Sequence, residues 1–450
     1  MAGTWTGMNK VRPGAYMVFK GVRQANLAIG TRGVVVMPMV LPWGNNEDLI
    51  RVSAMDFVNG ETLKLIGIDV SDPRIIPIRE AFKNASTVLV GKLNANNTER
   101  ATVQIDSTET AQITVTATHR GTLGNDIKVA VVQNAQGVYE IVTLVDDIEQ
   151  DRQVAGEIGK FTPNGWITLS GEPDLVPDLT TGAALSGGTD GSTSPTTTHY
   201  QAFFKKASIH NWQVMAVTTD SATVAPVVKT YIENQRENLG KKVQAVVYNY
   251  STANYEGIIS IDQGYMLGDE VVEPKDAVGF VAGISAGANV NISNTYALIE
   301  GATSIINPKD AEDIIDALGT GKLVFSTRQD GQVVIEKDIN TLHNFSEERT
   351  YIFSKNRVIR CLDDLATQIT ALFENSYIGK VNNNDSGRSL FKGDVIHYLK
   401  TLEGLGAIQN FDAVTDVEVL PGNDIESVIV NVAIQAVDAM EKMYMTVLVS

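Results

Sequence analysis

Two abrupt changes in the spacing of apolar residues limit what this 450-residue chain can fold into. Between residues 94 and 190, apolar and polar side chains alternate, as in Thr102–Asp106 and Tyr139–Val145. A spacing of two is typical of β-strands that bury one face. On both sides of this stretch, strand-like segments alternate with segments of helical spacing. We therefore expect a β-rich domain at 94–190, inserted into an α/β core domain made of 23–93 and 191–353.

The core domain shows its alternation of strands and helices most clearly after the insertion. Residues 212–218 and 243–248 are short, strongly apolar runs that predict buried strands. Between them, 222–235 carries apolar residues three and four positions apart, which predicts a helix. Strands separated by helices favour a parallel or mixed sheet. Inside the β-rich stretch, the segment 146–159 indicates a helix.

The last part of the chain has a third pattern, which predicts a C-terminal α+β domain at 354–440. Its helices are expected at 358–375 and 390–402, and strands follow them. Residues 1–22 are expected to form an N-terminal arm and residues 441–450 a C-terminal arm strand. The predicted fold class is therefore α/β (α+β) and multidomain: an α/β core, an inserted β-rich domain, a C-terminal α+β domain and terminal β-strand arms.

Both arms contain β-prone segments with no evident partner in the chain. These segments are 15–20 and 443–449, and each alternates apolar side chains on two faces. An unpaired strand promotes aggregation unless a neighbour pairs with it. The arms therefore indicate a protein that pairs strands with other chains.

Composition argues against several functions. Lys and Arg number 36 against 53 Asp and Glu, so the formal net charge is −17. Such a chain is poorly suited to bind duplex nucleic acid or an anionic membrane. No apolar run approaches about 20 residues and no signal peptide is evident, so we expect synthesis and initial residence in a cytoplasm. One cysteine and five histidines without ligand-like spacing predict no metal site and no cofactor.

One motif offers an enzymatic alternative. Residues 283–287 read Gly-Ile-Ser-Ala-Gly, which matches the nucleophile elbow of serine hydrolases with Ser285 as the nucleophile. An elbow requires a strand before the serine and a helix after it, but 288–294 is rich in Asn and a poor helix. His343 or His397 would have to complete the triad. A further alternative is a binding module whose β insertion recognises a surface glycan.

Several segments resemble a single protein family. Residues 377–384, 398–402 and 406–411 resemble the C-terminal domain of contractile phage tail sheath proteins, and the closing segment 437–447 is similar too. Further similar segments follow the family's order over nearly the whole chain: 13–16, 121–127, 185–191, 338–341 and 355–358. The resemblance is to the sheaths of myophages and of phage-tail-like bacteriocins, and it leaves open which kind of particle the chain would serve.

The resemblance implies a non-enzymatic, structural subunit. Subunits of this family would polymerise as stacked hexameric rings around an inner tail tube, and the sheath would contract to drive the tube through a cell envelope without using a nucleotide. The implied partners are further copies of the chain, the inner tail tube protein, and baseplate and tail-terminator proteins, with no nucleic acid and no membrane anchoring. Assembly in the host bacterial cytoplasm would be followed by release as part of a phage or phage-tail-like particle.

The resemblance also implies roles for particular residues. Each arm would donate a strand to a neighbouring subunit, which is recognition by β-augmentation. The residues assigned to this exchange are Tyr16, Val18, Lys20, Tyr444, Thr446 and Leu448. The basic cluster of Lys355, Arg357 and Arg360 is expected to face the acidic tube, and the inserted domain is expected to lie on the outside of the sheath.

Overall fold

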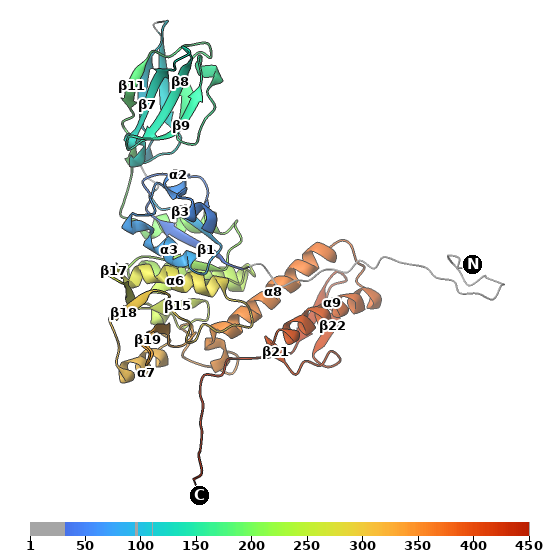
Figure 1. Ribbon diagram of the computed structural model, residues 1–450. Coiled ribbons are helices and arrows are strands. Elements are labelled where there is room, and N and C mark those ends of the chain that lie inside the picture. Colours follow the sequence, from blue (N-terminus) through green and yellow to red (C-terminus); the bar gives the residue numbers. More distant parts are fainter. Residues whose placement is uncertain (1–31, 95–97, 110, 450) are drawn as a thin grey trace, which may run out of the picture. The chain divides into compact units, whose positions relative to one another are not determined.

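The computed structural model describes residues 32–94, 98–109 and 111–449. The described residues form two compact units (Figure 1). The large unit holds 32–365 and 436–449, and the small unit holds 366–435. The predicted N-terminal arm lies outside the described residues.

The large unit is built on a six-stranded sheet with the order β15–β14–β13–β1–β3–β2. Neighbouring strands are parallel except for β2, which runs antiparallel to β3. The predicted mixed sheet is therefore confirmed. Its strands are β1 (Val34–Met39), β2 (Ile50–Ser53), β3 (Thr87–Lys92), β13 (Val214–Val217), β14 (Gln244–Tyr248) and β15 (Ile258–Ile261).

Helices cover both faces of this sheet because its strands are apolar on both sides. Val35 of β1 packs into one buried cluster, and the next residue, Val36, packs into a second. Residues of α3 and α6 belong to the first cluster, and residues of α4 and α5 belong to the second. The bounds are α3 (Ile76–Phe82), α4 (Thr197–Ala207), α5 (Val224–Glu233) and α6 (Pro274–Gly287).

Three glycines let α6 approach α3 closely, and the two helices lie beside each other in Figure 1. Gly279, Gly283 and Gly287 are four residues apart and so share one face of α6. A Cβ atom on any of them would lie 2.1–2.3 Å from a backbone carbonyl oxygen of α3 or of the turn after it. Close packing therefore explains two of the glycines in the elbow-like motif. The segment before Ser285, which an elbow requires as a strand, is part of this helix.

The inserted segment folds as two antiparallel sheets around a buried cluster that includes Ile113, Val129 and Ile141. One sheet has the order β10–β6–β5 and the other β11–β7–β8–β9. We keep 94–190 as the proposed extent of this domain. Its strands are β5 (Thr102–Asp106), β6 (Gln112–Ala117), β7 (Ile127–Gln133), β8 (Tyr139–Val145), β9 (Ile148–Val154), β10 (Ile167–Ser170) and β11 (Thr180–Ala184).

The helix predicted at 146–159 is wrong. Asp146 and Asp147 adopt positive φ angles of 51° and 63°, a backbone conformation that Asp tolerates better than most residues. They form the turn between β8 and β9, which pair as a hairpin. A strand, β9, therefore occupies half of the segment for which a helix was predicted.

Shorter elements complete the large unit. Two-stranded ladders are formed by β4 with β12 and by β19 with β20, and β16 pairs with both β17 and β18. The bounds are α1 (Ala54–Val58), α2 (Thr62–Ile66), α7 (Ala311–Gly319), β4 (Thr98–Glu99), β12 (Thr189–Asp190), β16 (Gly264–Leu267), β17 (Glu270–Val272), β18 (Ala302–Ile306), β19 (Phe325–Thr327) and β20 (Val333–Ile335).

The small unit contains the end of α8, all of α9 and a β-hairpin of β22 and β23. The two helices predicted here are confirmed, although both are longer than expected. The strands predicted after these helices are present, and β23 and β24 are separate short strands. The bounds are α8 (Asn356–Ser376), α9 (Asp385–Gly404), β21 (Ile408–Gln409), β22 (Val417–Pro421), β23 (Val428–Val432) and β24 (Gln435–Ala436).

Trp43, from the loop between β1 and β2, packs into the buried cluster of the inserted segment. Its ring lies 5.8 Å from that of Trp166 and meets the ring of His119 edge-on at 5.1 Å. Burial, together with the charges of Lys92 and Arg100, lowers the pKa of His119 to about 4. The imidazole therefore remains neutral in the folded protein at mildly acidic pH.

Gly283→Ala should destabilise the protein by about 1–3 kcal/mol because its methyl group would meet the carbonyl oxygen of Ala81. The control is Gly393→Ala in α9, where a Cβ atom meets nothing within 4 Å. That change should stabilise the protein by about 0.5–1 kcal/mol through helix propensity. Urea unfolding followed by circular dichroism measures both. An equal change in the free energy of unfolding for the two variants would contradict the tight contact of α6 with α3.

His119 should make the inserted domain less stable as the pH falls from about 6.5 to about 4. In this window the unfolded chain takes up a proton that the folded chain does not, so the free energy of unfolding decreases. Urea unfolding monitored by tryptophan fluorescence across the window should show this slope in the wild-type chain. His119→Gln should reduce the slope. Parallel pH profiles for the two proteins would show that His119 does not cause this pH dependence.

Candidate assembly interface

The C-terminal segment 437–449 has no helix or strand within this single chain (Figure 1). Most of its apolar side chains face water: Tyr444 is 90% exposed and Leu448 is 93% exposed. Thr446 is exposed as well. A continuous exposed apolar segment is typical of an interaction site. The predicted strand 443–449 therefore does not pair with any residue that the structure describes.

The segment is nevertheless fixed at its beginning. Lys355 is only 4% exposed, and its Nζ atom lies 3.1 Å from Oδ2 of Asp438 and 2.5 Å from Oε2 of Glu441. Thr295 donates a hydrogen bond of 3.1 Å to the other carboxylate oxygen of Glu441. We call Lys355, Asp438 and Glu441 the root clamp. It holds the chain up to residue 441 on the large unit, and the residues after 441 extend from it.

Two opposing effects act on the pKa of Lys355. Burial lowers this pKa, whereas the hydrogen bonds and charges of Glu441 and Asp438 raise it, and the net shift is upward. The ammonium group therefore remains charged throughout the neutral range. The stabilisation that it provides is fully present below its usual pKa and is lost only as the pH rises through the higher folded-state value.

A buried polar network fixes the beginning of α8 beside the root clamp. Arg360 donates hydrogen bonds of 2.7 Å to Asp338 Oδ2 and to the backbone oxygen of Ile292, and Arg360 and Asp338 are both almost fully buried. Asn356 donates to Asp338 Oδ1 at 2.9 Å, and the backbone N–H of Asn294 donates to Oδ2 at 2.9 Å. Asp338 therefore binds several groups around the start of one helix.

The three cations that were expected to face a tube are buried in the described structure. Lys355, Arg357 and Arg360 are 4%, 8% and 1% exposed, so none of them presents its charge on the surface of the chain. Burial also lowers the pKa of Arg357. Two of the three groups bind carboxylates of the large unit. Their spacing resembles that of a basic surface patch because the acidic partners, Asp338 and Asp438, are distant from them in the sequence.

The β22–β23 hairpin of the small unit is a two-stranded sheet within the described residues. Leu420 and Ile429, which face each other in this ladder, are both partly exposed. An isolated two-stranded hairpin is marginally stable and leaves the backbone groups of its outer edges available for pairing. This hairpin therefore offers a place where a further strand can be added.

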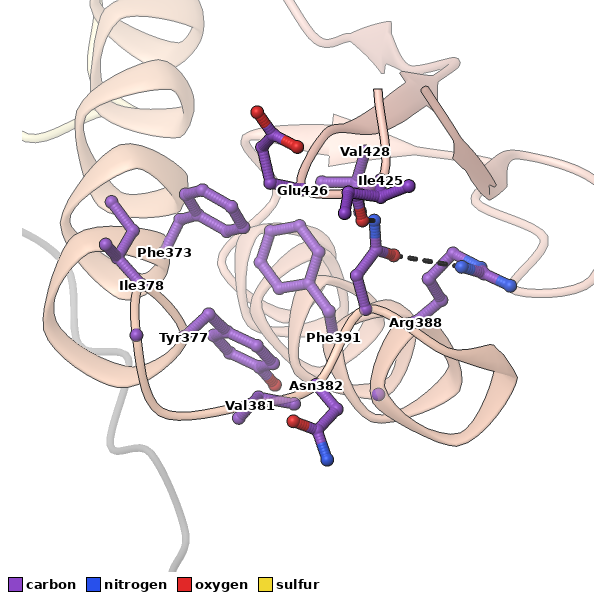
Figure 2. A pocket seen from close by; sticks show the side chains of 13 residues that line it. Phe373, Tyr377, Ile378, Val381, Asn382, Arg388, Phe391, Ile425, Glu426 and Val428 are labelled. Carbon is purple, nitrogen blue, oxygen red and sulfur yellow. Dashed lines mark hydrogen bonds between the residues drawn. The ribbon is translucent and has the colours of Figure 1, made fainter. Parts of the chain in front are cut away.

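A groove of about 590 Å³ lies beside the hairpin and contains a group of aromatic rings (Figure 2). The ring of Tyr377 lies 4.7 Å from that of Phe391, which lies 5.3 Å from that of Phe373. Asn383 donates hydrogen bonds of 2.9 and 2.8 Å to backbone oxygens of Ile425 and Ser427 and so joins the α8–α9 loop to the hairpin turn. The groove therefore has an apolar wall and a firmly held rim.

The remaining predicted site residues differ in whether the structure describes them and in how they lie. Tyr16, Val18 and Lys20 lie outside the described residues, whereas Tyr444, Thr446 and Leu448 are described and exposed. Ser285 lies inside α6, and its hydroxyl group is buried without a hydrogen-bond partner in the described structure. This position contradicts the strand–turn–helix geometry of the hydrolase alternative.

Neither a metal centre nor a spanning helix is found in the part of the chain that the structure describes. No three His, Cys, Asp or Glu side chains gather there as metal ligands. No described helix is both long and apolar enough to cross a membrane. The sequence interpretation missed the root clamp, for which the only local signal was the spacing of Asp438 and Glu441 near the apolar end of the chain.

Comparison with family models assigns nearly the whole chain to structural proteins of phage tails. The models match in order: the tail sheath protein Gp18 domain III N-terminal region at 32–93, the phage tail sheath protein beta-sandwich domain at 96–190, the phage tail sheath protein central domain at 193–341 and the phage tail sheath C-terminal domain at 348–450. The chain belongs to the phage tail sheath protein family, and its role is that of a structural sheath component.

Individual proteins resemble this chain over nearly their full lengths. The phage-like element PBSX protein XkdK of Bacillus subtilis is 32% identical, with 98% of both chains covered. The crystal structure of the sheath tail protein from Desulfitobacterium hafniense is 33% identical, with a TM-score of 0.79 over 96% of this chain and 99% of that one. The contracted helical sheath of the anti-feeding prophage shares the fold at 11% identity, with a TM-score of 0.58 over 98% of this chain and 99% of that one.

Lys355→Met should release the root of the C-terminal segment, because Asp438 and Glu441 would lose their cation. NMR order parameters of the backbone at 438–442 should fall toward the values of a flexible segment, because the charged hydrogen bonds that hold its root are lost. Lys442→Met removes the same charge from an exposed position in the same segment and should leave the order parameters unchanged. Unchanged order parameters in Lys355→Met would show that the clamp does not hold the segment.

Proposed function

We propose that copies of this chain polymerise as stacked hexameric rings around an inner tail tube, and that the sheath contracts to drive the tube through a cell envelope. The observation that carries this proposal is the exposed apolar segment after residue 441, which has no partner within the described chain. The shared fold with a helical sheath described in its contracted state supports it. Assembly on a tube and baseplate, closed by a terminator protein, would take place in a bacterial cytoplasm before the particle is released.

The segment 443–449 would be donated as a strand to a neighbouring copy. Tyr444, Thr446 and Leu448 would point to one face of the completed sheet, because side chains alternate along a strand. The receiving element would be the β22–β23 hairpin, whose edges lack a third strand within the described residues. The eight described residues after Glu441, 442–449, span about 26 Å when extended, which is long enough to form a strand of ordinary length. Tyr16, Val18 and Lys20 would belong to a second donated strand at the other end of the chain.

The root clamp gives this link a mechanical role. Because Lys355 holds Asp438 and Glu441 on the large unit, a pull on a donated strand would move the large unit of its own subunit. Subunits joined in this way would move one ring after another once the baseplate releases the first ring. The extended sheath would store the required free energy at assembly, so no nucleotide would be consumed.

Negative-stain electron microscopy of the full chain and of a variant that ends at Glu441 tests the polymer. The full chain should form tubes or rings at high concentration and raised salt, and the shortened chain should remain monomeric because it lacks the donated strand. Circular dichroism of the shortened chain controls for folding. Polymers of equal abundance in both samples would contradict the donated-strand mechanism.

Val447→Pro provides a sharper test of backbone pairing. Proline removes the N–H group and cannot take part in a ladder, whereas Val447→Thr keeps both the N–H group and the β-branched shape. Sedimentation should show polymerisation abolished by Val447→Pro and retained by Val447→Thr. The position is exposed in the single chain, so neither change should alter its folding.

A further inference from the structure

A small pocket in the large unit brings three cations together where the inserted segment leaves the core sheet. Its volume is about 210 Å³. The core contributes the end of β3, the loop before β2 and the last turn of α4, and the inserted segment contributes β4 and the loop after β6. The lining residues are Asn46, Glu47, Lys92, Asn94, Thr98, Arg120 and Lys206.

The three cations donate to carbonyl oxygens and not to carboxylates. Lys92 Nζ donates to the backbone oxygen of Arg120 at 2.7 Å, and Arg120 Nη1 donates to that of Thr98 at 2.7 Å. Lys206 donates to the backbone oxygen of Asn46. None of the three belongs to an ion pair between described residues. The pocket therefore holds positive charge without a carboxylate in direct contact with it.

The acids nearby do not neutralise this charge by contact. Glu47 lines the pocket but is exposed, and it acts on Lys206 only through longer-range attraction. Asp190 acts on Lys92 in the same way, while its two carboxylate oxygens accept hydrogen bonds from the backbone N–H and the hydroxyl group of Thr122. Three cations against one lining acid give an excess of positive charge in a chain whose net charge is −17.

Burial makes this excess costly. Lys92 is 5% exposed, and burial, with the nearby charge of Arg120, lowers its pKa to about 8. A buried ammonium group that lacks a counter-ion is destabilising, and an anion in hydrogen-bond range offsets that cost. Arg120 supplies a planar group with several donors, one of which, Nη1, donates to the backbone oxygen of Thr98. Such a group suits carboxylate and phosphate oxygens.

We propose that this pocket binds an oxyanion through Lys92, Arg120 and Lys206. The oxyanion would be a phosphate-like ion from solution or the carboxylate of an acidic side chain from a neighbouring copy, and this second source rests on the proposed polymer. In both cases the ligand joins Lys92 and Lys206 of the core to Arg120 of the inserted segment. Occupation of the pocket therefore fixes the inserted domain to the core by a charge-assisted bridge.

Thermal unfolding of the full chain with inorganic phosphate tests the site. Phosphate is exchanged against chloride at constant ionic strength, in the wild type and in Lys206→Gln, Arg120→Gln and Lys205→Gln. Lys205 is exposed and adjacent to Lys206, so its substitution removes the same charge outside the pocket. Phosphate also stabilises proteins by exclusion from their surfaces. The site is therefore tested by the difference between variants in the change of Tm that phosphate causes.

The wild type and Lys205→Gln should show a saturable rise in Tm of about 2 °C with phosphate. Lys206→Gln and Arg120→Gln should bind phosphate at least about tenfold more weakly, because each loses a charge-assisted hydrogen bond. Equal phosphate dependence in all four proteins would overturn the proposal. The variant that ends at Glu441 should retain the phosphate effect, so a failure of the donated-strand mechanism is distinguishable from a failure of this site.

Polymerisation of the same proteins distinguishes the two sources. If the ligand is a neighbour's carboxylate, phosphate should inhibit polymerisation of the wild type, and Lys206→Gln should polymerise poorly while Lys205→Gln behaves normally. If the ligand is a free ion, all of these proteins should polymerise alike while the Tm differences remain. Light scattering measures polymer formation in both cases.

Discussion

The carboxylate of Asp338 binds the side chains of Arg360 and Asn356 and the backbone of Asn294, all within the buried interior of the large unit. Removing one partner of a buried ion pair typically costs about 3–5 kcal/mol, because the remaining charge stays in surroundings that cannot solvate it. The beginning of α8 is therefore fixed against the core. Lys355, directly before this helix, is placed by the same contacts and holds the root of the C-terminal segment.

This arrangement separates a rigid part of the molecule from a part that is open to pairing. The chain is held through Glu441, and the apolar residues beyond it are exposed. Pairing by backbone hydrogen bonds tolerates variation in side chains, whereas a buried charge network requires defined partners. A structural sheath protein needs both properties, because its subunits must keep their own fold while they join others.

Regular elements were predictable from sequence because they depend on local periodicity. The helices α5, α8 and α9 and the strands β13, β14, β5 and β8 follow from the spacing of apolar residues. The segment 146–159 was predicted wrongly because two aspartates with positive φ start a hairpin there. Spacing alone does not reveal such a turn, since Asp is compatible with several turn and helix positions.

The candidate site was less predictable because it depends on contacts between distant residues. The charges at 355, 357 and 360 are spaced like a surface patch, and their burial follows from acids such as Asp338 and Asp438. The serine motif at 283–287 is equally ambiguous in sequence, since close helix packing requires small residues as much as an elbow does. Only the exposed C-terminal segment could be predicted from its own sequence. Its apolar side chains alternate as in a strand, and no nearby segment is an evident partner for it.

The short ladder between β4 and β12 has a consequence for how this protein can be modified. Thr98 pairs with Asp190 and Glu99 with Thr189, so the chain enters and leaves the inserted segment at directly adjacent positions. The Cα atoms of residues paired in an antiparallel ladder are about 4.5–5.5 Å apart. Replacing the insertion therefore requires that this short separation be bridged and that Trp43, which packs into the inserted segment, be covered or replaced. An unrelated domain whose two ends meet at that separation is a suitable replacement, which makes this ladder the natural junction for building chimeric sheath proteins that display a chosen cargo.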